Sequence, residues 1–531
     1  MLFNSFEFLF LFLPIIFIGY FTLLKYDKNG LAMLLLFISS IFFYSYANLK
    51  YTIVLLFSIV INFFIGKYLS NSSFTPKGKR TLFIGIIFNI LLLAYFKYFN
   101  FFIDDLNIIL KQDFFTSKIA LPLGISFFTF QQLSYIIDSY KGETKDYDFI
   151  SYGVFVTFFA KISAGPIVNH KEMLSQFSAD ENKKINFDNI SRGLFILSIG
   201  LVKKIIISNE IALIANSGFD VAQNLNFFEA WITSLSFTFQ LYFDFSGYCD
   251  MAYGIALLFN IVLPINFKSP YKASSIKDFW NQWHITLGRF LTKYVYIPLG
   301  GNRRGKLINY RNLFIVFLIS GIWHGAGWNF IIWGSLHGLA VLFNKFWSDN
   351  NLKMNKYLGI FITFNFVNIG WIFFRALDLK SAFKVLSGMV NFKSISDLQM
   401  IQPKNIKLII LFLSLFIICF VISKLKYNKL YIKFIKIGLF IASSIIAFNL
   451  FSISNYYHLS DILINVEYSQ DIIYSLMLIA ISFIVAFTCK SSMEILDDFK
   501  YNNFTLFICI VFFFISIINL NKISVFLYFN F

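Results

Sequence analysis

Charged residues are scarce in this chain of 531 residues: Asp, Glu, Lys and Arg make up 14% of it, whereas 58% of the residues are hydrophobic. Uncharged apolar runs recur along the whole sequence, and many approach the roughly 20 residues that cross a bilayer. This composition excludes a soluble globular class. We therefore expect an all-α polytopic membrane protein, with residues 1–531 forming a single integral-membrane domain.

Cysteine is also rare, and several common catalytic motifs are missing. The sequence has no CxxC pair and no cysteine beside histidines at metal-ligand spacing, so neither disulfides nor a metal site is expected. The GxxxxGK[ST], GxSxG and HExxH patterns are absent. The N-terminal segment lacks a basic region and a small-residue cleavage site, which predicts a first transmembrane helix that is kept and not a removed signal.

Cations outnumber anions, and the formal net charge is +17. The cations fall in short loops between apolar runs, where they set membrane orientation, so we expect no nucleic-acid partner. The loops after the first and third apolar runs are basic; they contain or adjoin Lys25, Lys28, Lys67, Lys77, Lys79 and Arg80. The positive-inside rule then predicts an N-terminus outside and both of these loops in the cytoplasm.

The apolar segments predict roughly a dozen membrane crossings together with some partial ones. They lie at 6–24, 31–47, 52–69, 81–99, 118–137, 149–163, 190–208, 231–262, 312–344, 357–374, 407–424, 431–450, 470–488 and 503–520. Residues 312–344 carry no acid, lysine or arginine; they are too long for one ordinary span and short for two with a turn.

The most basic segment, residues 268–311, contains nine cations and the single acid Asp278. Within it, SSIKDFWNQWHITLGRFLTKY has apolar residues at helical spacing and a capping serine, Ser275, three residues before Asp278. This pattern predicts an amphipathic helix lying on the cytoplasmic surface of the membrane.

One histidine lies inside the uncharged stretch, in SGIWHGAGWNF at 320–330. If a helix enters the membrane after Arg311, His324 lies about 20 Å deeper, well within the hydrocarbon region. Gly325 and Gly327 allow the helix to break there, which membranes tolerate only against protein or a water-filled cavity. The sequence therefore predicts that His324 lines an internal cavity.

Two interpretations of His324 follow from its position. A histidine in a membrane can simply hydrogen-bond a neighbouring helix, but imidazole is also suited to accept a proton near neutral pH. Desolvation favours the neutral ring, the form that a general base requires. His284, in the predicted surface helix, has the same two alternatives: ordinary interfacial packing or a functional role.

Other polar residues are candidates for binding or for lining a passage. The run PLGGNRRG at 298–305 offers backbone N–H groups together with Arg303 and Arg304, which could bind phosphates, although its basic residues also suit a plain topology signal. Asp244 and Asp250 stand in an apolar run and do not share a helical face. They could relay protons, orient a histidine or make structural hydrogen bonds.

Six stretches together resemble the membrane-bound O-acyltransferase family. They are LPLGISFFTFQQLSYIIDSYKGE at 121–143, AGPIVNHKEM at 164–173, QLYFDFSGYCDMAYGIALLFNIVLPINFKSPY at 240–271, DFWNQWHITLGRFLTKYVYIPLGGNRRG at 278–305 followed by SGIWHGAGWNFIIWGSLHG at 320–338, and WIFFRALDLKSAF at 371–383. The pair WHIT and WHGA is the most specific feature. The bacterial branch that these stretches are similar to contains alginate O-acetylases, peptidoglycan O-acetyltransferases and D-alanyl-teichoic-acid transfer proteins.

The resemblance implies a ring of transmembrane helices around a central funnel, with broken or re-entrant helices and a family core at approximately residues 100–390. The role of the C-terminal helices, 400–531, is left open. By resemblance, the catalytic residues are His324 and His284. Donor binding is expected from Arg303, Arg304, Lys293 and Trp283, and the expected tunnel-lining residues are Trp323, Asp244 and Asn312.

The resemblance also implies the substrates and the location. An acyl group, expected to be acetyl, would come from a cytoplasmic thioester, acetyl-CoA or an acyl-carrier protein. It would pass to an extracytoplasmic SGNH-type acyltransferase partner that acylates a cell-wall or surface polysaccharide. The chain would lie among the lipids of the bacterial inner membrane. No permanently bound cofactor is expected. The alternatives are D-alanyl transfer to teichoic acid, a transporter or flippase without acyl chemistry, and a catalytically silent scaffold.

This sequence departs from the family's pattern at two places. Many relatives have cations where Asn281 and Gln282 stand, and an Arg–Asp pair where Thr292 and Lys293 stand. These differences concern recognition of the donor or contact with a partner. They leave the histidine pattern intact.

Overall fold

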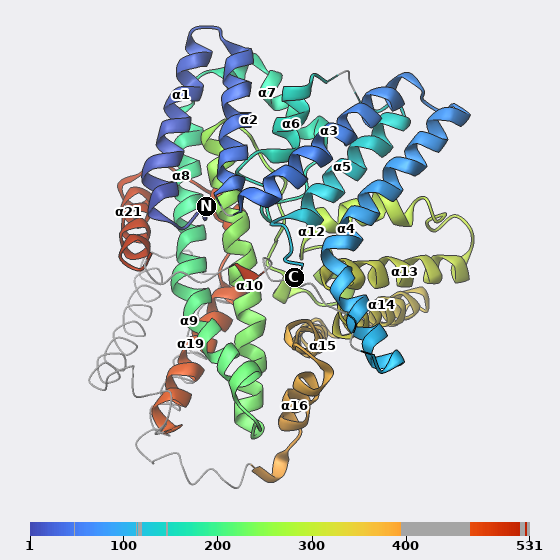
Figure 1. The fold of residues 1–531 in the computed structure, drawn as a ribbon. Coiled ribbons are helices and arrows are strands. Elements are labelled where there is room, and N and C mark those ends of the chain that lie inside the picture. Colours follow the sequence, from blue (N-terminus) through green and yellow to red (C-terminus); the bar gives the residue numbers. More distant parts are fainter. Residues whose placement is uncertain are drawn as a thin grey trace.

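The computed structural model describes residues 1–46, 48–112, 114, 119–144, 147–394, 468–520 and 526–527. In these parts of the chain the secondary structure is helical, and the only β-type pairing in them is one isolated antiparallel bridge between Phe267 and Trp283. The expectation of an all-α membrane protein is confirmed. Figure 1 shows the helices grouped around the long helix α10.

The helices of the N-terminal half have the following bounds: η1 Glu7–Phe12, α1 Leu13–Lys25, α2 Asn29–Ser45, α3 Leu49–Asn71, α4 Pro76–Leu110, α5 Ile125–Tyr140, α6 Phe149–Thr157, α7 His170–Ser178, η2 Asp180–Lys183, α8 Phe187–Leu201, η3 Val202–Ser208, α9 Asn209–Asn216, η4 Ser217–Val221 and α10 Phe227–Leu258. The remaining ones are η5 Pro270–Lys272, α11 Ile276–Trp280, α12 Ile285–Leu291, η6 Thr292–Tyr296, α13 Lys306–His324, α14 Trp328–Asp349, α15 Lys356–Arg375, α16 Leu379–Met389, α19 Tyr468–Thr488, α20 Ser492–Asp497 and α21 Asn503–Ile518.

Most predicted apolar segments correspond to helices, including α1 to α5, α8, α10, α15, α19 and α21. Four helical stretches of the described chain have the length and composition to cross a membrane: Glu7–Lys25, Leu49–Asn71, Pro76–Leu110 and Lys356–Arg375. Segment 149–163 is helical only to Thr157, and the chain continues from there as a buried loop. The predicted spans 407–424 and 431–450 lie outside the described residues.

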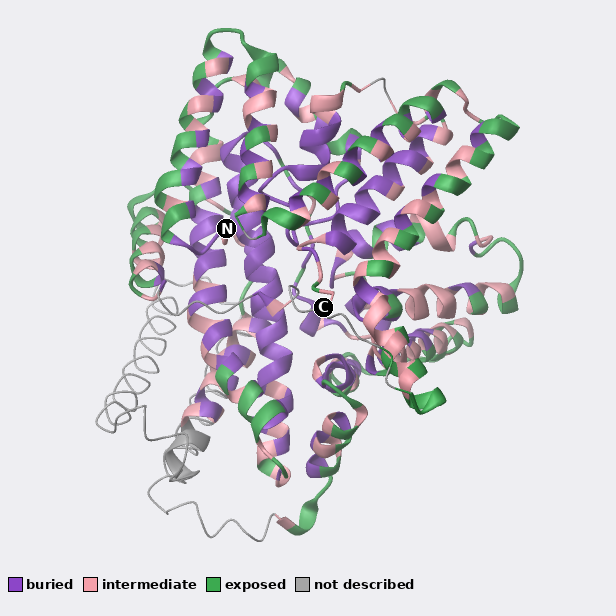
Figure 2. Ribbon diagram, in the orientation of Figure 1, coloured by how far each residue is buried: buried purple, intermediate pink, exposed green. Residues whose placement is uncertain are grey.

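Helix α10 forms the centre of the bundle. Its start is fixed by a capping box, in which the Asn226 side chain accepts from the Glu229 N–H and the Glu229 carboxylate accepts from the Asn226 N–H. Figure 2 shows α10 buried along most of its length. A helix that is buried on nearly all sides is mostly apolar all round, and the two buried acids of α10, Asp250 and Asp244, are paired with Lys203 and Lys204.

The predicted surface helix at 274–294 is wrong. The segment is interrupted after α11, and α12 begins only at Ile285, because His284 adopts a left-handed backbone conformation with φ 45°. Trp283 and His284 are both 1% exposed, so this part of the chain lies inside the protein and not on the membrane surface. The helical spacing of the apolar residues reflects burial on several sides by neighbouring helices.

Candidate active site

His324 is the last residue of α13, at a break between two helices. The chain leaves the helix at Gly325 in an extended conformation, and α14 starts after Gly327. A Cβ at Gly325 would come within 2.0 Å of the Phe330 ring, so the break needs a residue without a side chain there. The break predicted from the glycines is therefore present, and it ends α13 with a buried imidazole that is 3% exposed.

His284 is held at the second interruption by Asn266. The His284 Nδ1 lies 3.2 Å from Asn266 Oδ1, which also accepts from the backbone N–H of Thr286 at 3.2 Å and from its hydroxyl at 3.0 Å. The two Thr286 donors identify this Asn266 atom as the carbonyl oxygen, so His284 donates from Nδ1. This tautomer places the ring's lone pair on Nε2.

The two histidines, 40 positions apart in sequence, are neighbours in space. Their ring centroids are 6.4 Å apart, and both rings pack on the indole of Trp323, at 6.1 Å from His284 and 4.8 Å from His324. Trp333 and Phe374 close the other sides of His324, with centroids at 5.1 and 5.2 Å. An aromatic cage of this kind excludes bulk water and fixes the plane of the imidazole.

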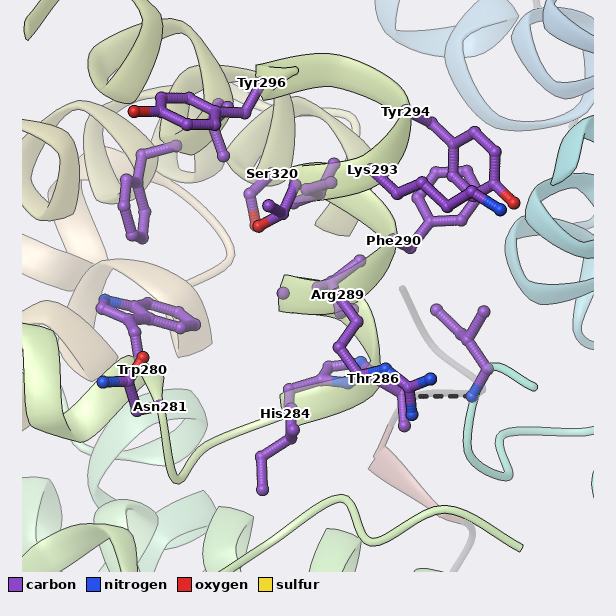
Figure 3. A pocket seen from close by; sticks show the side chains of 18 of the residues that line it. Trp280, Asn281, His284, Thr286, Arg289, Phe290, Lys293, Tyr294, Tyr296 and Ser320 are labelled. Atoms are coloured by element: carbon purple, nitrogen blue, oxygen red, sulfur yellow. Dashed lines mark hydrogen bonds between the residues drawn. The ribbon is translucent and has the colours of Figure 1, made fainter. Parts of the chain in front are cut away.

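The two rings border different cavities. His284 lines a cavity of about 680 Å³ together with Trp280, Arg289, Lys293 and Ser320 (Figure 3). His324 lines a cavity of about 20 Å³, with room for about one water molecule, whose other polar lining comes from Lys97, Ser126 and Ser163. One histidine of the pair thus lines a large chamber, and the other lines a small polar one.

The large cavity carries positive charge, and part of that charge is paired. Lys293 donates to Asp138 at 2.9 Å and to Glu143 at 3.2 Å, and Arg289 forms an ion pair with Glu172. Lys277 also lines this cavity. The cavity can therefore accept an anionic ligand, which would compete with these carboxylates for the cations.

Asp138 is buried beside Lys293, and its carboxylate contacts several elements at once. Its Oδ2 accepts from Lys293 at 2.9 Å, from the Tyr294 hydroxyl at 2.9 Å and from Asn169 at 3.1 Å, and it lies 3.2 Å from His170 Nε2. The carboxylate joins α5, α7 and η6, and it sets where the Lys293 ammonium can lie.

The other predicted site residues are placed differently. Arg303 and Arg304 are exposed in the turn before α13 and are not among the residues that line the large cavity. Trp283 lies behind the cavity wall, against Phe279 and Trp371. Among the tunnel-lining predictions, Trp323 does line the small cavity.

Asp244 and Asn312 are not among the residues that line the two cavities described above, and their side chains make structural contacts. The Asp244 carboxylate forms an ion pair with Lys204 and accepts from the backbone N–H of Leu527, which ties the C-terminal segment to α10. The Asn312 amide donates to the carbonyls of Leu299 and Gly301, at 3.2 and 3.0 Å, and so closes the turn before α13. Both contacts satisfy buried polar groups.

Sequence reasoning missed Lys97, Asp138 and Asn266. Lys97 had a signal, because it is a lone cation within the apolar run 81–99, and an ionisable residue inside a membrane span marks a functional candidate. Asp138 and Asn266 had no such signal, since both stand near segment ends. Among the described residues, no cluster of three or more His, Cys, Asp or Glu could hold a metal ion.

The fold and the site define a polytopic membrane protein with an enclosed pair of buried histidines. The model of the MBOAT, or membrane-bound O-acyltransferase, family matches residues 15–379. The chain therefore belongs to this family, and it is a multi-pass membrane O-acyltransferase.

Three relatives are similar in sequence to this chain, to different degrees. A peptidoglycan O-acetyltransferase of Helicobacter pylori is 50% identical over 426 residues, which cover 75% of this chain and 81% of the relative. A probable alginate O-acetylase of Pseudomonas aeruginosa is 36% identical over 438 residues, 81% of this chain and 83% of the relative. A teichoic acid D-alanyltransferase of Bacillus subtilis is 28% identical over 268 residues, 48% of this chain and 68% of the relative.

Proposed function

We propose that the chain takes an acetyl group from cytoplasmic acetyl-CoA and passes it across the inner membrane for O-acetylation of peptidoglycan, by way of an extracytoplasmic SGNH-type transferase. The relative named a peptidoglycan O-acetyltransferase, at 50% identity, supports acetyl as the group and peptidoglycan as the polymer. The similarity to the relative named a D-alanyltransferase is lower and covers less of the chain, so D-alanyl transfer is the second candidate.

One observation carries the catalytic part of this proposal. His324 is buried at a helix break with its ring centroid 6.4 Å from that of His284, and His284 lines the large cavity while His324 lines the small one. A donor in the large cavity and an acceptor reaching the small one would meet at these rings. Burial costs a polar side chain free energy, which favours a function over simple packing.

The reaction would proceed by general-base catalysis at His324. The ring takes the proton of the acceptor hydroxyl while the hydroxyl oxygen attacks the thioester carbonyl carbon. A C–O bond forms, the C–S bond breaks, and the imidazolium returns the proton to the leaving thiolate, which departs as the thiol. Positioned acid–base catalysis of this kind contributes about 10²–10⁴-fold to the rate. His284 would form the wall against which the thioester lies.

The donor phosphates would bind at the mouth of the large cavity. Lys293 and Arg289 line the cavity and are held there by carboxylates, so they are the first candidates to meet an anion. Arg303 and Arg304, in their exposed turn, would attract the nucleotide part from outside the cavity. The acetyl end carries no charge and can enter the apolar interior.

The test uses the purified full chain in detergent with radiolabelled acetyl-CoA, and measures release of free CoA and of labelled acetate or ester. His324→Gln should lower this release by about 10²–10⁴-fold while the protein remains monodisperse. His337→Gln is the matched control, because His337 is equally buried but lies in neither cavity lining, and it should keep most of the activity.

The outcomes separate the candidate functions. Unchanged release in His324→Gln would remove His324 as the base. Release from a D-alanyl carrier protein but not from acetyl-CoA would favour the D-alanyl function. No release from either donor by the wild-type chain would favour a transporter or a silent scaffold.

A further inference from the structure

At the end of α13 that carries His324, the terminal backbone carbonyls accept hydrogen bonds from two adjacent side chains of α4. The last carbonyls of a helix have no partner within the helix, and inside a membrane water cannot supply one. Here the Tyr98 hydroxyl donates to the carbonyl of Ile322 at 2.5 Å, and the Lys97 amine donates to the carbonyls of Trp323 at 2.5 Å and His324 at 2.9 Å. Three consecutive carbonyls at the break are thus capped from one turn of another helix.

Burial of the Lys97 amine at this position costs free energy. Lys97 is 9% exposed, and it lies in the middle of one of the longest apolar helices. Its amine donates to three uncharged groups: the two carbonyls and the Ser126 hydroxyl at 3.4 Å. A buried lysine costs several kcal/mol unless its environment compensates for it. The negative end of the α13 dipole supplies part of this compensation.

Its location relative to His324 explains why the cost is tolerated. The Lys97 amine binds the carbonyl of the same residue whose imidazole lies in the aromatic cage, and Lys97 and His324 line the same cavity of about 20 Å³. Without these bonds, the last turn of α13 would end in unsatisfied carbonyls beside two flexible glycines. The backbone of His324, and with it the direction of its ring, would then be set less narrowly.

We infer that Lys97 is a positioning residue that holds the broken end of α13 and thereby aims the His324 ring at the reacting atoms. This inference rests on the proposed role of His324 as the base. It assigns Lys97 no contact with the donor or with the acceptor. Loss of Lys97 should therefore reduce the rate of the chemical step and leave donor binding nearly intact.

The test compares Lys97→Met, which keeps the length and packing but has no donor, with the wild type and with Tyr98→Phe. All three are assayed as monodisperse full-length protein for CoA release from acetyl-CoA across a range of donor concentrations. Lys97→Met should lower kcat by about 10²-fold, the loss that a displacement of about 1 Å can cause, with KM within about two-fold of the wild type. Tyr98→Phe removes the more distant bond, to Ile322, and should lower kcat less.

A purely structural role predicts another result: a lower yield and a lower melting temperature, with unchanged kcat per folded molecule, and this would overturn the inference. If Lys97→Met gives no monodisperse protein, Lys97→Gln decides, because it retains an N–H donor on a shorter stem. Its kcat should fall by about tenfold at constant KM, and an unchanged kcat would equally overturn the inference.

His324→Gln, measured in parallel, keeps the two proposals distinguishable. If His324→Gln is inactive while Lys97→Met is fully active, only the positioning role is wrong. If His324→Gln is active, the proposed function itself is wrong, whatever the lysine variants show.

Discussion

Asn266 determines which nitrogen of His284 carries a proton. Its single Oδ1 accepts from His284 Nδ1 and from the N–H and hydroxyl of Thr286, while its amide nitrogen lies 3.4 Å from Cys249 Sγ. The side chain is 3% exposed, so these donors have little access to water as an alternative. One amide therefore fixes both the tautomer and the local backbone around His284.

Replacing this amide should affect both stability and activity. Asn266→Ala leaves buried donors of His284 and Thr286 without their acceptor, which should destabilise the protein by about 1–3 kcal/mol. Activity should fall by about tenfold or more, because the His284 ring, against which the thioester would lie, is no longer held in one orientation. Thermal unfolding in detergent and CoA release from acetyl-CoA would measure the two effects.

Asn266→Asp is the control, since it keeps an acceptor oxygen at the same place. It should retain more activity than Asn266→Ala. Equal activity of the two variants, at the wild-type level, would show that the contact of Asn266 with His284 does not matter for the reaction.

At the scale of elements, the hairpin of α13 and α14 depends on small residues at its crossing. A Cβ on Gly321 would lie 2.4 Å from the Phe330 carbonyl oxygen and 2.9 Å from the Cα of Gly334. Glycines at such a crossing let two helix backbones pack closely in a membrane. Gly321 precedes His324 by less than one turn, so this packing also supports the site.

Gly321→Ala should therefore separate the two helices and shift the end of α13. We expect a loss of about 1–3 kcal/mol from overpacking, seen as a lower melting temperature, together with reduced acetyl-CoA turnover. Gly30→Ala is the matched control: no atom lies within 4 Å of its added Cβ, and both properties should stay at the wild-type level. A Gly321→Ala protein as stable and active as Gly30→Ala would contradict the close packing of the hairpin.

Hydropathy and glycine placement predict most helices of this chain. The interruption at His284, which they do not predict, has a physical reason. The break at 325–327 follows from the residues themselves, because glycines beside a buried histidine inside a long apolar run weaken the helix there. The interruption at His284 does not, because Ile276, Phe279 and Leu287 keep helical spacing across it. Only the contact with Asn266, from a distant loop, makes the left-handed turn favourable.

At the scale of the whole molecule, the site is assembled from residues that no local pattern connects. His324 could be predicted from its depth in an apolar run, and its pairing with His284 was suggested only by resemblance. The contact of Lys97 with His324 joins positions 227 residues apart, and that of Lys293 with Asp138 joins positions 155 apart. Such pairs depend on how antiparallel helices align, which one sequence does not specify.

The orientation in the membrane determines from which side the donor enters. Phe74, in the turn between α3 and α4, packs on Tyr140 with ring centroids at 5.6 Å, and the Ser73 hydroxyl donates to the Ser139 carbonyl at 3.4 Å. This turn therefore lies at the same end of α5 as Asp138 and the Lys293 side of the large cavity. The basic residues around it predict, by the positive-inside rule, that this end faces the cytoplasm.

The two ends of α4 provide the test of this orientation, because the helix begins at Pro76 and ends at Leu110. Single cysteines replace Lys77 or Gln112 in a chain whose four native cysteines have been removed. A membrane-impermeant maleimide added to spheroplasts should label Gln112→Cys and leave Lys77→Cys unmodified until the membrane is permeabilised. The reverse pattern would place the large cavity on the outer side, where acetyl-CoA is absent. The donor pathway proposed above would then be wrong, even if His324 still proved to be essential for the reaction.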